Sequence, residues 1–282
     1  MEQRPWSKTQ LRKLGVSIRD GSPLPQNVPG FDEVIVWYND LASHVQKRVA
    51  ELDWTPLLED RAPEITSRAK TIDTLTDKLR RQPNIGLGAI QDIAGVRFEA
   101  EMTLREQDSV ADAIAQMFGH DPISPCLKDI RATPHSGYRA VHLWLNLEAP
   151  VEVQIRTHLQ GEWANMYEAA GDLFGREIRY NDSPEDIETR TLVEGLQALS
   201  TEEIRYLEQD GQLIQDLKME ILEWTELPRF SFSLKTRRIR KAREAQRVQL
   251  AEMQDNYSLR ETGIREGLDG LRLSLIDAYK GE

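Results

Sequence analysis

The chain has 282 residues, of which 39% are hydrophobic and 29% are charged, and its net charge is −11. At roughly 150 residues per domain, this length fits about two domains, or one domain with a long appendage, and the composition fits one core with a charge-rich surface or helical extension around it. The net charge excludes a uniformly basic nucleic-acid coat, although it leaves room for a local basic patch. The single cysteine, Cys126, excludes an internal disulfide and a zinc site of four thiolates.

The sequence contains no candidate membrane span. No stretch approaches the roughly 18 consecutive apolar residues that a spanning helix needs. The N-terminal residues MEQRPWSKTQ are polar where a signal peptide has an apolar core. We therefore expect a protein of the cytoplasm.

The first third of the chain predicts helices and then a strand. Leu11, Leu14 and Ile18 recur at helical spacing, and Ser7 is the candidate N-cap. Residues 22–30 hold three prolines and predict a linker. Residues 31–53 predict a long amphipathic helix, and residues 64–81 predict a short strand that runs into a basic helix.

The middle of the chain predicts a sheet, and the last third predicts helices. Strand patterns cover 93–101, 138–148 and 151–157, and helical patterns cover 103–119 and 162–174. This order indicates an α+β domain with a mixed β-sheet flanked by helices. Residues 185–222 and 235–280 predict a helical C-terminal part, and 227–235 a turn or short strand. The expected divisions are 1–30, 31–182 and 183–282.

A basic cluster follows the first predicted strand. It consists of Arg68, Lys70, Thr74, Lys78, Arg80 and Arg81. Lys70, Thr74, Lys78 and Arg81 are spaced so that one helix would align them on one face. Aligned cations repel one another unless a polyanion, such as a triphosphate, lies against them. The alternative is a solvated basic helix face.

Two further polar clusters lie in the predicted strands. Asp92, at the start of a strand, is a candidate Mg²⁺ ligand. The alternative is that it only caps the backbone there. Gly95 would allow a substrate to approach the strand closely. Period-two alternation places Glu152, Gln154 and Arg156 on one strand face, which would be ordinary for a solvent-exposed strand. The adjacent predicted strand adds more polar groups: Tyr138, Arg139 and His142.

These segments resemble a known family. DIAGVRF, SGYRAVHL and VEVQIRTHLQGEWA, with SRAKTIDTLTDKLRR upstream, are similar to the synthetase domain of the RelA/SpoT proteins, the alarmone synthetases, over residues 64–172. The resemblance implies a nucleotidyltransferase-like fold. It also implies Mg²⁺-dependent transfer of pyrophosphate from ATP to the 3′-hydroxyl of GDP or GTP, yielding the alarmones ppGpp and pppGpp.

The resemblance also implies roles for individual residues. Arg68 and Arg97 would stack on the adenine of ATP, and Lys70, Thr74, Lys78 and Arg81 would hold its triphosphate. Asp92 and Glu152 would be the catalytic, metal-binding carboxylates, with Glu152 the candidate base. The acceptor side would consist of Tyr138, stacked on the base, with Arg139, His142, Gln154 and Arg156.

Departures from the family pattern leave the acceptor open. Residues 132–136 lack a lysine that family members often carry, and Arg131 and His135 are the candidate substitutes. Asn165 and Glu168 differ from the usual Ala-Glu-x-x-His helix. A second hypothesis is a toxin-type member that pyrophosphorylates the 3′ end of tRNA and is countered by an antitoxin protein. A third is a degenerate fold that only binds nucleotide or RNA.

Two other motifs bear on function. His120-Asp121 is a His-Asp pair, and the long members of the family that this sequence resembles carry an HD-type hydrolase domain ahead of the synthetase. Here the pair lies inside the synthetase region, so we expect a structural turn and no alarmone hydrolase. The basic segment 235–247 is either a solvated helix or an RNA-phosphate surface. Its candidate RNA-binding residues are Arg237, Arg238, Arg240 and Lys241. Small alarmone synthetases often assemble, so an oligomer is one outcome.

Overall fold

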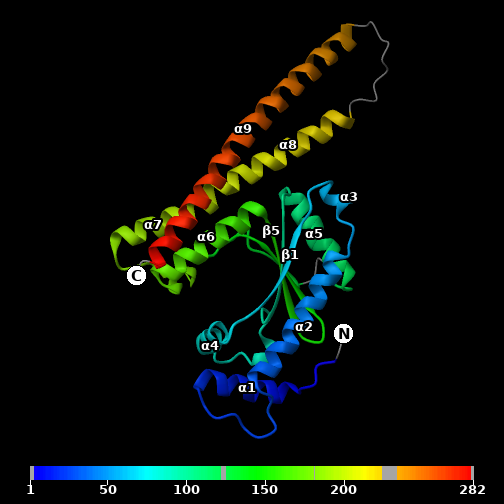
Figure 1. Ribbon diagram of the computed structural model, residues 1–282. Coiled ribbons are helices and arrows are strands. Elements are labelled where there is room, and N and C mark those ends of the chain that lie inside the picture. The colour runs from blue at the N-terminus through cyan, green and yellow to red at the C-terminus, as the bar shows by residue number, and fades with distance from the viewer. Residues whose placement is uncertain (1–2, 122–124, 181, 224–233, 281–282) are drawn as a thin grey trace. The chain divides into compact units, whose positions relative to one another are not determined.

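A computed structural model describes residues 3–121, 125–180, 182–223 and 234–280 (Figure 1). The chain divides into two compact units. The sheet unit comprises Met1–Met102, Glu106–Ala132 and Ala140–Thr157, and the helical unit comprises Thr103–Arg105, Thr133–Arg139 and His158–Glu282. These units divide at Thr157, within the predicted 31–182 segment. The predicted domain boundaries therefore stay a prediction.

The elements of the first part follow the predicted order closely. The helices are α1 (Lys8–Asp20), α2 (Phe31–Ala50), α3 (Thr55–Leu58), α4 (Ile72–Arg81) and α5 (Leu104–Met117), with a 3-10 turn η1 (Leu87–Ala89). The strands are β1 (Glu64–Ala69), β2 (Ala94–Ala100), β3 (Leu127–Asp129), β4 (Val141–Asn146) and β5 (Pro150–Thr157). Ser7 caps α1, as the sequence predicts, and the structure adds a reciprocal hydrogen bond from Gln10.

The five strands form one mixed sheet in the order β1-β2-β5-β4-β3. β2 and β5 are parallel, whereas the other three neighbouring pairs are antiparallel. The predicted α+β fold with a mixed sheet is confirmed. The sequence patterns do not predict β3, because its three residues are too few to show alternation.

One face of the sheet carries the hydrophobic core of the sheet unit. Val96 and Phe98 of β2 and Val153 and Ile155 of β5 are fully buried there, since alternate residues of a strand point to the same face. Side chains of α2 and α5 belong to the same buried cluster. With this face covered, the opposite face is left for polar side chains.

The helical unit has its own core. Its elements are α6 (His158–Phe174), η2 (Arg176–Tyr180), α7 (Ile187–Ala198), a π-helical turn η3 (Leu199–Ile204), α8 (Arg205–Glu223) and α9 (Leu234–Lys280). Trp163 and Tyr167 stack with ring centroids 4.7 Å apart, and α8 and α9 run side by side (Figure 1). The predicted helical C-terminal part is confirmed.

Residues 227–233 of the predicted turn or strand lie outside the described residues, and Leu234 already belongs to α9. Within the described part of the chain, no helix combines the length and the apolarity that crossing a membrane requires.

Candidate active site

Polar residues of three neighbouring strands share the face of the sheet opposite the core. The register pairs Glu152 of β5 with Gly95 of β2 on one side and with Trp144 of β4 on the other. One step along, Gln154 pairs with Arg97 and with His142. Directly paired residues lie on the same face of a sheet, so these positions form one polar surface.

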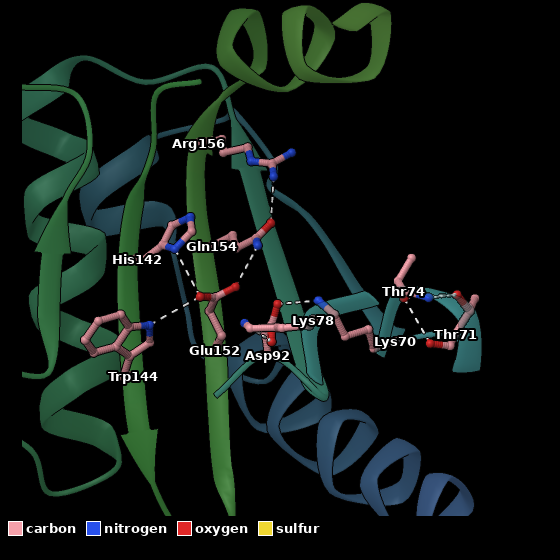
Figure 2. Close-up of polar contacts among 10 residues, drawn as sticks. All are labelled: Lys70, Thr71, Thr74, Lys78, Asp92, His142, Trp144, Glu152, Gln154 and Arg156. Carbon is pink, nitrogen blue, oxygen red and sulfur yellow. Dashed lines mark hydrogen bonds and ion pairs between the residues drawn. The ribbon is translucent and has the colours of Figure 1, made fainter. Parts of the chain in front are cut away.

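Glu152 is at the centre of a hydrogen-bond network on this surface (Figure 2). Its Oε1 atom accepts from Trp144 Nε1 at 3.2 Å and lies 3.1 Å from His142 Nδ1, and its Oε2 atom accepts from Gln154 Nε2 at 2.7 Å. Only 7% of the residue is exposed. The alternative of an ordinary solvent-exposed strand face therefore does not hold at Glu152, because its neighbours enclose the carboxylate.

The network fixes the charge of Glu152. Burial raises the pKa of this carboxyl, but the hydrogen bond and charge of His142, together with the hydrogen bonds from Gln154 and Trp144, outweigh burial and lower the pKa to about 2. The group is thus an anion at neutral pH. A buried anion held by three donors is suited to binding a cation or a hydroxyl proton.

The network continues along β5 to Arg156. Arg156 Nη2 donates to Gln154 Oε1 at 2.6 Å, and Arg156 Nη1 lies 3.3 Å from Glu99 Oε1. Arg156 is 3% exposed, so it too is enclosed. Three of the five predicted acceptor residues, His142, Gln154 and Arg156, therefore gather with Glu152 in a single network.

A second centre forms at Asp92. Lys78 Nζ donates to Asp92 Oδ1 at 2.7 Å, and Lys70 Nζ pairs with Asp92 Oδ2 (Figure 2). Lys78 lies on α4, whereas Lys70 precedes the helix, where its backbone N–H donates to Ile93 O at 3.3 Å. The prediction that one helix aligns both lysines is wrong in this detail, but the fold brings both ammonium groups to one carboxylate.

The start of α4 depends on two threonines. Thr71 is the N-cap and accepts from Thr74 N, and the Thr74 hydroxyl donates back to Thr71 O at 2.9 Å. Leu75 and Leu79 are the buried residues of the helix. The cap therefore fixes where the helix begins, directly after Lys70.

The backbone brings the two carboxylates to one end of the sheet. Asp92 precedes β2 by two residues, and Glu152 is paired with Gly95, the second residue of that strand. Carboxylate oxygens from one or two residues, completed by water and phosphate, are what Mg²⁺ takes in proteins. The donor set fits such an ion, although no group of three or more His, Cys, Asp or Glu side chains forms a metal cage among the described residues.

The remaining predicted ATP residues are placed as follows. Arg97 is half-buried on the polar face. On β1, the backbone of Arg68 is paired with Gly95, and Arg68 comes two residues after the residue that is paired with Arg97. The side chain of Arg68 lies outside the described residues. Arg81 is exposed at the end of α4, where its Nε donates to Asp77 O at 3.3 Å.

Tyr138 and Arg139 belong to the helical unit. Tyr138 is half-buried against the core of that unit, and Arg139 is 2% exposed and pairs with Glu208 of α8 at 2.6 Å. Of the basic C-terminal residues, Lys241 is exposed on α9. The side chains of Arg237, Arg238 and Arg240 lie outside the described residues.

Trp144 is the site residue that the sequence analysis missed. It is two residues after His142, so strand alternation alone places it on the same face, next to Glu152. The alternation in the sequence contained this signal. A tryptophan in a strand is usually predicted to belong to the hydrophobic core, however, and only the structure shows that its indole N–H binds a carboxylate.

The HD pair has a structural explanation. His120 Nδ1 lies 2.9 Å from Phe118 O, and His120 Nε2 accepts from Asn146 N at 2.9 Å. Both ring nitrogens are thus engaged by backbone groups. This agrees with the expected turn.

The sequence matches a family model described as the region found in RelA/SpoT proteins, over residues 67–171. It is also 46% identical, over 223 residues, to uncharacterized proteins of Mycobacterium tuberculosis and Mycobacterium bovis, covering 78% of this chain and 76% of each relative. The chain belongs to the RelA/SpoT family. This RelA/SpoT protein is therefore an enzyme of the pyrophosphokinase type.

Solved structures show the same fold. The small alarmone synthetase 1 from Bacillus subtilis is 21% identical, with a TM-score of 0.50, and the match covers 67% of this chain and 98% of that one. A second structure of that synthetase, bound to its product pppGpp, matches with 20% identity and the same TM-score and coverage. The RelA/SpoT fold therefore accounts for the sheet.

Proposed function

We propose that this RelA/SpoT protein transfers pyrophosphate from ATP to the 3′-hydroxyl of GDP or GTP, which makes ppGpp or pppGpp and releases AMP. The observation that carries the proposal is the buried, anionic Glu152 at the same end of the sheet as Asp92 and its two lysines. The related Bacillus synthetase binds pppGpp as its product, which supports the acceptor class.

Binding of ATP would rest on the segment before and along α4. Lys70, Thr74, Lys78 and Arg81 would hold the triphosphate, and Arg68 and Arg97 would stack on the adenine by their guanidinium planes. Lys70 and Lys78 both pair with Asp92. Phosphate oxygens would compete with that carboxylate for the same ammonium groups, so ATP binding would release Asp92.

Asp92 and Glu152 would hold Mg²⁺. The ion would supply charge neutralisation at the phosphates, the larger part of catalysis in phosphoryl transfer. Glu152 would also accept a hydrogen bond from the 3′-hydroxyl. As the candidate base, it would take the proton of that hydroxyl as the pyrophosphate is transferred.

The acceptor nucleotide would meet two sets of residues. Tyr138 would stack on the base, and His142, Gln154 and Arg156 would line the acceptor side through the network that already orients them. Stacking of a base on an aromatic ring contributes about 1–3 kcal/mol.

The acceptor is tested by incubating the protein with ATP labelled in the β-phosphate, Mg²⁺ and one acceptor at a time. Label on GDP or GTP supports the proposal. Label on the 3′ end of deacylated tRNA instead would replace it with the toxin-type function. Label on neither would leave a fold that binds nucleotide only.

One observation supports the second candidate function, transfer of pyrophosphate to the 3′ end of tRNA. Arg131, a candidate substitute for the missing lysine, lies 2.9 Å from Asp129 and 2.5 Å from Asp108, and it donates to Gln107 at 3.0 Å. Its guanidinium is thus engaged by acidic and amide neighbours, which weakens the case for binding acceptor phosphates. The antitoxin partner, an oligomeric state and a cytoplasmic location stay predictions.

A further inference from the structure

The loop before β4 contains Tyr138, and it is fixed to the helical unit at both sides of that residue. On one side, Gly137 has φ +81°, and a Cβ there would lie 2.8 Å from the Trp163 ring and 3.1 Å from Gln197 Cα. On the other side, Arg139 is buried in the same unit. The position of Tyr138 thus depends on its neighbours in the chain.

Arg139 is held by α8 and the π-helical turn. Its Nη2 lies 2.6 Å from Glu208 Oε2, and its Nη1 donates to Ser200 O at 3.4 Å. Glu208 is 6% exposed, and its other oxygen accepts from Gln160 of α6 at 2.9 Å. Together these partners hold the guanidinium, which is 2% exposed, within the helical unit.

The π-helical turn supplies one of these contacts. Ser200 O also accepts from Arg205 N, five residues on, which is the wide spacing of a π-helix. Such turns occur frequently at functional sites, because the extra residue alters the backbone locally. Here the turn offers a buried carbonyl to Arg139.

We propose that Arg139 and Glu208 are positioning residues for the acceptor: their buried ion pair fixes the loop 133–139, and so holds Tyr138 where it stacks on the acceptor base. The inference rests on the proposed function for the role of Tyr138. It gives the helical C-terminal part a task in catalysis. It also replaces the expected direct contact of Arg139 with the acceptor.

The test compares Glu208→Gln with Asp210→Asn. Glu208→Gln removes the charge while its side-chain oxygen can still accept from Gln160. Asp210 is on the same helix and makes an exposed pair with Arg260 at 2.8 Å, so it is the matched control. We expect Glu208→Gln to raise the KM for GDP or GTP by about 10- to 100-fold, the scale of a roughly 1 Å displacement of a positioned group. The KM for ATP should stay within about twofold.

A double variant separates positioning from stability. Arg139→Met with Glu208→Leu replaces the pair by apolar side chains, a change that proteins often tolerate. We expect a folded protein, by circular dichroism and thermal unfolding, whose acceptor KM is still raised. A purely structural pair would lower the active fraction, and thus the apparent kcat, with both KM values unchanged; that result in the folded double variant would overturn the proposal.

Hydrogen exchange provides a readout without activity. Tyr138 N donates to His135 O at 2.9 Å, so exchange of the 133–139 amides reports the order of the loop. Glu208→Gln should speed this exchange, and Asp210→Asn should not. Unchanged exchange would refute the inference even if transfer to GDP is found. If the wild-type protein labels neither GDP nor GTP, the proposed function fails, and faster exchange would still show the loop to be held by this pair.

Discussion

Glu152 combines burial with a full negative charge, and this combination makes it the most informative residue to change. Glu152→Gln should reduce pyrophosphate transfer by at least about 100-fold, because it would remove the proposed metal ligand and the proposed acceptor for the 3′-hydroxyl. It should also cost about 1–3 kcal/mol in the free energy of unfolding, since the new amide N–H₂ meets donors in a buried network.

Two measurements check this change: transfer of labelled pyrophosphate and urea unfolding. Glu148→Gln, exposed in the β4–β5 turn, is the control and should leave both unchanged. A Glu152→Gln variant that keeps more than about a tenth of the wild-type rate would show that Glu152 is not the catalytic carboxylate.

The low pKa of Glu152 also predicts how stability depends on pH. The folded pKa is about 2 against an ordinary value of 4.5, so on acidification the unfolded chain takes up this proton first. The network's contribution to stability is therefore complete above about pH 4.5 and is lost as pH falls toward 2.

Trp144→Phe tests the cause of that shift. Removing the indole donor should raise the pKa of Glu152, so the variant should lose less stability than wild type between pH 4.5 and 2. Urea midpoints across this range measure the difference. Identical slopes in the two proteins would mean that Trp144 does not hold the charge.

A substitution at Lys78 should affect the binding of ATP much more than the stability of the fold. Lys78→Met should raise the KM for ATP by about 10- to 100-fold, because a hydrogen bond to a charged group contributes about 1.5–3 kcal/mol. The loss in stability should stay below about 1 kcal/mol, since the pair with Asp92 is partly solvated and Lys70 remains as a partner. Lys47→Met, at an exposed pair, is the control; an unchanged KM for ATP in Lys78→Met would remove Lys78 from the ATP site.

At the scale of elements, replacing either of two glycines of the helical unit by alanine should change the stability of the protein, with opposite signs. Gly137→Ala should destabilise the protein by about 1–3 kcal/mol, because the added Cβ meets Trp163 at a positive φ. Gly195→Ala, exposed on α7 with no heavy atom within 4 Å of the new Cβ, should stabilise by about 0.5–1 kcal/mol. Thermal unfolding of both variants gives the signs, and a stabilised Gly137→Ala would contradict the close packing.

How far the sequence predicts each element depends on how local its cause is. Helices α1 and α2 and strands β2 and β5 follow from apolar spacing within a few residues, so their patterns were sufficient. β3 has three residues, and the π-helical turn is continuous in sequence with the helices on both sides. Neither leaves a periodic signal.

The site follows the same rule. Asp92, Glu152 and the lysines stand out in family motifs, whereas the burial of Glu152 depends on Trp144 and His142 of the next strand. The pair of Arg139 with Glu208 joins residues far apart in the chain. Such contacts appear only when the fold is known.

For the whole molecule, the distribution of charge suggests an experiment that distinguishes the two proposed acceptors. The net charge is −11, so tRNA would have to be held by a local basic segment such as 235–247. Changing Arg237, Arg238, Arg240 and Lys241 to Glu should suppress any transfer to tRNA while turnover with GDP or GTP survives. Each lost phosphate contact should flatten the log–log salt dependence of RNA binding by about one unit.

The outcome of this charge reversal is clear in both directions. Ready synthesis of ppGpp with no effect of the reversal would leave segment 235–247 as a solvated helix. Transfer to tRNA alone, lost on reversal, would make the toxin-type function correct.

The parallel pairing of β2 with β5 has a kinetic consequence. These two strands, Ala94 against Val151, are separated in sequence by α5, β3 and β4, whereas β4 and β5 form a local hairpin. Closing the long loop costs more chain entropy than closing the hairpin, so we expect the hairpin to form first and its docking on β2 to be the slow step of folding. During synthesis on the ribosome, the two carboxylates would meet only after β5 has emerged, and no earlier nascent chain would consume ATP.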